Sequence, residues 1–365
     1  MKIVVFGLTI TSSWGNGHAT LWRGLCKALA RAGHEVVFFE RDMPYYAEAR
    51  DLHELRGGKL VLYPDWDQIR RQARAETGSA DAAIVTSYCP DALAAGELIG
   101  ESGHALSVFY DLDTPVTLAR LASGSEVRYV GARGLADFDL VLSYTGGAAL
   151  DELRSRLYAR NVAPLYGHVD PQLHRPEPAR PHYRAHLSYL GTYSADRQAA
   201  LEACFIGPAR QRPQHRFLIA GAQYPQEFPW SSNIYFVRHL PPAEHPAFFC
   251  SSRLTLSVTR APMARTGWCP SGRLFEAAAC GTPVLSDSWE GLEHFFTAGK
   301  DILVAQSEDD ALAALDLGDA ELARLGCAAR ERVLAEHTSE KRACELVAHL
   351  EAARRGAPQS IPIEA

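Results

Sequence analysis

Short apolar runs alternate with amphipathic helical segments along both halves of this chain. Such runs, rich in Val, Ile and Leu, are typical of strands buried on both faces of a parallel sheet. They occur at residues 2–6, 36–39, 60–63, 82–85, 106–109 and 140–142, and again at 187–190, 217–221, 234–237, 254–257 and 283–285. The alternation predicts the α/β fold class, with two Rossmann-like doubly wound domains facing each other across a cleft. Ligands of such folds bind at the carboxyl ends of the strands.

The chain has 365 residues, which suits two domains of about 150–180 residues each. Prolines cluster between residues 171 and 181 among polar residues, where they interrupt regular structure. We therefore predict an N-terminal domain over 1–170, a Pro-rich linker over 171–186 and a C-terminal domain over 187–338. The remainder, 339–365, is a helix followed by a tail, and this helix is a candidate to cross back to the N-terminal domain.

Charge and cysteine content limit the possible partners and compartments. The net charge is −6 and no basic run is present, so nothing indicates a nucleic-acid surface. The eight cysteines form no CxxC pair, which argues against a zinc site and fits the reducing cytoplasm. No segment reaches the roughly 18 apolar residues of a membrane span, and the N-terminus lacks the pattern of a signal peptide. We expect a cytoplasmic protein.

Residues 270–286 carry the strongest indication of function. Ser271 and Gly272 open a helix, which a Gly-Thr-Pro turn connects to a short apolar strand. The start of a helix offers unpaired N–H groups and partial positive charge, a suitable seat for a diphosphate beside Arg273. One turn further on, Glu276 is placed to accept hydrogen bonds from two ribose hydroxyls. The segment thus predicts a nucleotide site.

Two other segments of the second half are candidates for the same site. In the turn at 191–197, the N–H groups of Gly191 and Thr192 are candidates to reach the β-phosphate, with Arg197 compensating its charge. The alternative is an ordinary capped turn with a solvated arginine. Arg260 and Arg265 precede residue 270, and either neutralises a leaving diphosphate or has a plain surface role.

The Gly-rich loop at 7–17 follows the first strand. It is neither a GxGxxG loop nor a Walker loop, which disfavours an NAD-dependent oxidoreductase. His18 comes directly after it, and an imidazole near neutral pKa suits removal of a proton from an attacking hydroxyl. The alternative is that His18 only caps the following helix or packs against Trp22.

Asp111 and Asp113 lie at the end of the strand over 106–109. Asp-x-Asp invites a metal interpretation, but Asp113 or Thr114 before Pro115 also makes a good helix N-cap. Asp111 remains a candidate base or a carboxylate that orients acceptor hydroxyls. The histidines of the Pro-rich segment lack a ligand spacing. We therefore predict no metal site.

The run from Ser271 to Gly281 resembles the nucleotide-sugar signature of the group 1 glycosyltransferases. Runs at 110–115, 143–147, 190–194 and 288–293 resemble the spore maturation protein CgeB-like branch. The resemblance implies the GT-B fold, a nucleoside diphosphate sugar (UDP-, dTDP- or GDP-sugar) as donor, and no cofactor. It places the donor in the second domain and the acceptor, near His18, in the first. It also places Arg238 and His239 where relatives read the nucleobase through main-chain atoms.

One position departs from that signature, because Trp268 stands where the group 1 enzymes have a glutamate eight residues before Glu276. The sugar and the stereochemical course therefore stay open. The acceptor, which is a small molecule, a glycan or a protein, stays open too. Two alternatives to glycosyl transfer remain: a nucleotide-sugar 2-epimerase on the same scaffold, and a non-catalytic nucleotide-sugar binding protein.

Overall fold

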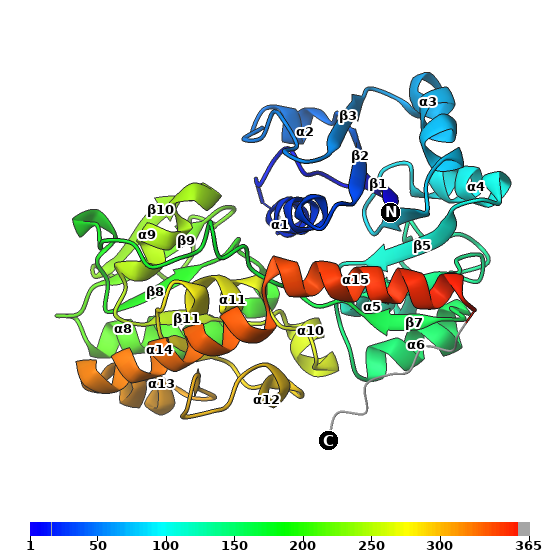
Figure 1. Cartoon of the computed structure of the whole chain (residues 1–365). Helices are drawn as coiled ribbons and strands as arrows, with labels where there is room; N and C mark the ends of the chain where they lie inside the picture. Colours follow the sequence, from blue (N-terminus) through cyan, green and yellow to red (C-terminus); the bar gives the residue numbers. More distant parts are fainter. Residues whose placement is uncertain (16, 357–365) are drawn as a thin grey trace. The chain divides into compact units, whose positions relative to one another are not determined.

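A computed structural model describes residues 1–15 and 17–356 of the chain. The chain divides into two compact units (Figure 1). The first unit is Met1–Tyr166 together with the C-terminal segment that starts at Ser339, and the second is Gly167–Thr338. The predicted tail beyond residue 356 lies outside the described residues.

The first unit is built on a parallel sheet with the strand order β3-β2-β1-β4-β5-β6-β7. Its central strands are almost wholly buried, as their uninterrupted apolar sequences require. The strands are β1 (Lys2–Gly7), β2 (Glu35–Arg41), β3 (Lys59–Tyr63), β4 (Ala82–Thr86), β5 (Leu106–Asp111), β6 (Leu140–Ser143) and β7 (Val162–Pro164). The helices are α1 (His18–Arg31), α2 (Pro44–Ala47), α3 (Trp66–Gly78), α4 (Ala92–Ser102), α5 (Thr114–Ala122), α6 (Ala148–Leu157) and α15 (Ser339–Arg354).

The second unit repeats the arrangement with the parallel order β10-β9-β8-β11-β12-β13. The strands are β8 (Leu187–Leu190), β9 (Phe217–Gly221), β10 (Ile234–Arg238), β11 (Thr255–Ser257), β12 (Val284–Ser286) and β13 (Leu303–Val304). The helical segments are η1 (Pro181–Tyr183), η2 (Ala195–Arg197), α7 (Gln198–Leu201), η3 (Glu202–Ile206), α8 (Gly207–Gln211), η4 (Pro242–Glu244), α9 (His245–Cys250), α10 (Ala261–Thr266), α11 (Gly272–Ala279), α12 (Leu292–Phe295), α13 (Glu308–Leu315) and α14 (Asp319–Glu336). In both sheets the strand order reverses beside the first strand, which is the doubly wound pattern.

The predicted fold class is confirmed, because both sheets are parallel and doubly wound. The strands β7 and β13 are absent from the predicted set, because they are only three and two residues long. The Pro-rich segment differs from the predicted linker, since it lies within the second unit and buries Tyr183 in it. In the described part of the chain, no helix is both long and apolar enough to cross a membrane.

The last helix, α15, belongs to the first unit and packs against α1 (Figure 1). Leu346 and Leu350 are fully buried with the core residues of β1 and α1. Two ion pairs at the surface join its ends to the same unit, Arg31 with Glu340 and Arg354 with Asp81. The chain therefore completes the first core only with its last helix.

Glu40, at the end of β2, fixes the Gly-rich loop that leads to α1. Its buried carboxylate accepts hydrogen bonds from the N–H groups of Ile10 and Thr11, at 2.7 and 3.0 Å, and from the hydroxyl of Thr9 at 2.9 Å. A buried carboxylate requires such partners. Residues 9–11 of this loop are thereby held against the end of β2.

Substitution of Leu346 by alanine should destabilise the first unit by about 2–5 kcal/mol, because it removes buried side-chain contacts and leaves a cavity. Urea unfolding followed by intrinsic fluorescence measures the change. The matched control is Leu93→Ala, since Leu93 is 47% exposed and its loss should cost under about 0.5 kcal/mol. Equal unfolding midpoints for the two variants would show that α15 is not part of this core.

Candidate active site

Helix α11 begins at Gly272, as the sequence predicts. Ser271 is its N-cap, and the Ser271 Oγ accepts a hydrogen bond from the Arg273 N–H at 3.3 Å. A serine in this position favours helix initiation and leaves the positive end of the helix dipole at Ser271 and Gly272. The start of α11 therefore offers the backbone N–H groups of an anion site.

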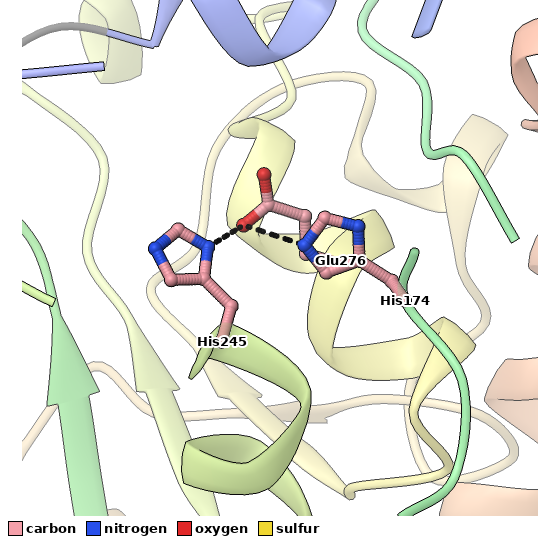
Figure 2. A group of neighbouring side chains, drawn as sticks. All are labelled: His174, His245 and Glu276. Carbon is pink, nitrogen blue, oxygen red and sulfur yellow. Dashed lines mark ion pairs between the residues drawn. The ribbon is translucent and has the colours of Figure 1, made fainter. Parts of the chain in front are cut away.

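Glu276, one turn into α11, is a buried carboxylate and is 4% exposed. Its Oε2 lies 2.9 Å from the Arg273 Nη1, 3.4 Å from the His245 Nδ1 and 3.9 Å from the His174 Nε2 (Figure 2). Burial alone would raise the pKa of Glu276, but the adjacent Arg273 guanidinium holds it well below its ordinary value. In Figure 2 the other carboxylate oxygen points away from both imidazoles. One oxygen is thus fixed by the protein, and the other is turned elsewhere.

The two histidines reach Glu276 from separate parts of the second unit. His174 comes from the Pro-rich segment, and His245 is the first residue of α9. The His245 Nε2 lies 3.2 Å from the Leu240 carbonyl oxygen. Burial lowers the pKa of His174 to about 4, so its ring is neutral. The sequence predicts no metal ligand at His174 and carries no signal for His245, because the proximity of the two histidines exists only in the fold.

The turn after β8 makes hydrogen bonds to the sheet and to its own side chains. The Gly191 N–H donates to the Ala220 carbonyl at 2.9 Å and is therefore not available to a phosphate. This corrects the predicted role of that group. The Arg197 Nη1 donates to the Thr192 carbonyl at 3.1 Å, which holds the arginine against its own turn. Thr192 and Arg197 remain candidates for the phosphate site.

The other residues predicted for the donor site lie in different surroundings. Arg238 is exposed at the end of the edge strand β10, and His239 follows it in a left-handed conformation with φ 52°. Arg265 is exposed on α10. Arg260 forms an ion pair with Asp196, with 3.1 Å between Nε and Oδ2. None of these four residues contacts Glu276 in the interactions among the described residues.

Trp268 occupies the position of the missing glutamate in a left-handed conformation with φ 50°. Its N–H donates to the Glu290 carbonyl at 2.6 Å, so the segment before α11 is held against the loop after β12. In that loop the half-buried Asp287 accepts hydrogen bonds from the N–H and hydroxyl of Thr259, and its partial burial raises its pKa. Asp287 is a further carboxylate at the carboxyl edge of this sheet.

In the first unit, His18 is the first residue of α1 and lies beside Tyr88, with 5.7 Å between the ring centroids. Burial lowers the pKa of His18, and the charge of Asp113 partly offsets that effect. The imidazole is therefore neutral at physiological pH, the form that a general base requires. Tyr88, which follows β4, is a neighbour that the sequence analysis missed.

Asp111 lies at the end of β5 and is fully buried. Its Oδ1 accepts a hydrogen bond from the Asp113 N–H at 3.0 Å. Asp113 is the N-cap of α5, and Pro115 lies in the first turn, which confirms the helix start that the sequence predicts. Burial raises the pKa of Asp111 to about 6, and three hydrogen bonds oppose that rise. The first unit thus holds two titratable groups, His18 and Asp111, suited to proton transfer near neutrality.

Comparison with known proteins agrees with this geometry. Residues 197–348 match a family described as glycosyl transferase-like. None of the curated proteins matches the chain by sequence. Among solved structures, a sucrose-phosphate synthase from Thermosynechococcus elongatus is 15% identical, with 98% of this chain and 100% of that chain covered and a TM-score of 0.67.

Two further solved structures share the fold. HepE of Anabaena, in complex with UDP and glucose, is 14% identical over 96% of this chain and 100% of its own, with a TM-score of 0.66. An alpha-glucosyltransferase in complex with UDP-glucose and DNA containing an abasic site is 12% identical over 96% of this chain and 99% of its own, with a TM-score of 0.70. The fold is therefore that of the GT-B glycosyltransferases. The family match over residues 197–348 in turn supports a glycosyltransferase.

Substitution of Asp111 by asparagine should stabilise the protein by about 1–3 kcal/mol at about pH 7.5. When folding raises the pKa of an acid, ionisation of that acid destabilises the folded protein. The free energy of unfolding of the wild type should therefore drop below that of the variant as the pH rises from about 4 to about 6. Urea unfolding at both ends of that range measures the difference, which should shrink toward about pH 4. The exposed Asp137→Asn is the control, and a pH-independent difference for Asp111→Asn would contradict the assignment.

Proposed function

We propose that this protein transfers a sugar from a UDP-sugar to an acceptor hydroxyl, and that it acts in the cytoplasm as a CgeB-like member of the glycosyltransferases. The observation that carries the proposal is the buried Glu276 carboxylate one turn inside α11. A carboxylate held by one oxygen can use its other oxygen to accept hydrogen bonds from a ribose. A neighbouring helix start favours the diphosphate of the same ligand.

Donor binding falls to the second unit. Ser271, Gly272 and Arg273 would receive the diphosphate, because helix N–H groups and a guanidinium both favour phosphate oxygens. Thr192 and Arg197 extend this site from the turn after β8. The nucleobase would lie near Arg238 and His239, at the end of β10. UDP is preferred among the possible nucleotides because the UDP-bound neighbours share the fold and because Glu276 favours an intact ribose over the deoxyribose of dTDP.

Acceptor activation falls to the first unit. His18 removes the proton of the attacking hydroxyl, since its neutral imidazole has a free pair of electrons for that proton. Asp111 orients the acceptor or takes over as base. As the new glycosidic bond forms, the bond between the sugar and the diphosphate breaks. The departing UDP carries the negative charge that Arg273, Arg265 and the start of α11 stabilise.

Incubation with UDP-glucose and a panel of hydroxyl acceptors tests this function. We expect release of UDP that matches the amount of glycosylated product, and a fall in turnover of about 10²-fold or more for His18→Ala. His53→Ala, at an exposed histidine of the same unit, is the control. A sugar epimer formed from the donor alone would instead identify an epimerase. Binding of the donor without any product would identify a binding protein.

Substitution of Glu276 by alanine should weaken the binding of UDP by about 1–3 kcal/mol, because the ribose loses a charged hydrogen-bond acceptor. Titration calorimetry measures the change. The control is Glu331→Ala, which removes an exposed glutamate from α14 of the same unit. Unchanged affinity in the Glu276 variant would remove this residue from the donor site.

A further inference from the structure

Three potential metal ligands converge inside the second unit. One ligand atom from each of His174, His245 and Glu276 lies within 4.8 Å of the other two. Ion pairs join the His174 Nε2 and the His245 Nδ1 to the Glu276 Oε2. The carboxylate oxygen stands 3.4 Å from the His245 nitrogen and 3.9 Å from the His174 nitrogen (Figure 2). Donor atoms of a tetrahedral zinc site with bonds of about 2.0–2.1 Å lie about 3.3–3.4 Å apart. The separation between His245 and Glu276 therefore matches that of an occupied site, and the separation between His174 and Glu276 is wider.

The hydrogen bonding of His245 determines where its lone pair points. Its Nε2 faces the Leu240 carbonyl at 3.2 Å, and a carbonyl only accepts, so this nitrogen carries the hydrogen. In the neutral ring, the Nδ1 then directs a lone pair at the carboxylate of Glu276. Two acceptors that face each other at 3.4 Å repel unless a cation lies between them.

A single proton between His245 and Glu276 would leave the buried His174 without a partner. Its side chain is 1% exposed, and neither ring nitrogen has a hydrogen-bond partner among the residues that the structure describes. A buried polar atom without a partner is costly. A proton on His245 satisfies one contact, the one between His245 and Glu276. A divalent ion at the common point satisfies all three donor atoms.

We propose that His174, His245 and Glu276 form a binding site for a divalent transition-metal ion, with Zn²⁺ as the best fit. Two neutral imidazoles and one carboxylate are ligand types that zinc prefers, and three protein ligands leave a fourth position for water. The ion would join the Pro-rich segment to α9 and α11 and would lock the orientation of Glu276. It is distinct from a catalytic metal on the leaving diphosphate.

Arg273 and the ion use the same carboxylate oxygen. The Arg273 Nη1 donates to the Glu276 Oε2 at 2.9 Å, and its side chain is 28% exposed, so it is able to move into solvent. Two positive charges beside one oxygen repel each other. The guanidinium therefore compensates the carboxylate when the ion is absent and competes with the ion when it is present. Removal of Arg273 should tighten metal binding.

Cobalt titration of the metal-free, full-length protein tests the site without any sugar donor, so its outcome does not depend on the proposed function. We expect one Co²⁺ per chain with the intense visible absorption of a tetrahedral site, displaced by Zn²⁺. His174→Ala and His245→Ala should each weaken binding by about 100-fold or more, since changes outside the ligand shell already cost about 10–100-fold. Arg273→Ala should strengthen it.

His104→Ala is the matched control, because His104 is an exposed histidine of the first unit. Circular dichroism shows whether each variant is folded. If a histidine variant is unfolded, the nearly isosteric Glu276→Gln replaces it in the test. Three results would each overturn the proposal: a wild type that binds no ion, binding that survives both histidine substitutions, or a sulfur-to-cobalt charge-transfer band, which would assign the ion to the cysteines.

Discussion

A single buried negative charge organises the candidate donor site. Removing the Glu276 carboxylate from water is unfavourable unless positive charge and hydrogen bonds replace the lost hydration. Arg273 provides that charge from the same helix, three residues away, and two histidines approach from other segments. The position of the Pro-rich segment and the start of α9 therefore both depend on this carboxylate. The site is fixed in place before any ligand binds.

The first unit also contains buried carboxylates, but their charge is compensated differently. The Glu40 carboxylate is also buried, but it is satisfied by hydroxyl and N–H groups of the loop at 7–17 instead of by a cation. It holds residues 9–11 of that loop against the end of β2. Asp111, with less compensation, keeps a raised pKa. Full compensation thus fixes structure, and partial compensation leaves a group that can exchange protons near neutral pH.

Local sequence patterns predicted the fold well and the site only in part. The alternating apolar runs gave the central strands of both sheets, and Ser271 gave the start of α11, because both depend on neighbouring residues. The short strands β7 and β13 were not predicted, since two or three residues carry no periodicity. Convergence of His174, His245 and Glu276 was not predictable, because it depends on contacts across 31 to 102 positions of the chain. The hydrogen bond that occupies the Gly191 N–H could not be predicted either, because its partner, Ala220, is distant in the chain.

The central claim is that Glu276 accepts hydrogen bonds from the ribose of the donor. Calorimetry with UDP and 2′-deoxy-UDP, on the wild type and on Glu276→Ala, tests this contact directly. In the wild type the deoxy ligand should bind about 10-fold more weakly, as expected for one charge-assisted hydrogen bond. In the variant the two ligands should bind equally. An unchanged preference for UDP in the variant would contradict the claim, because another group would then recognise the ribose.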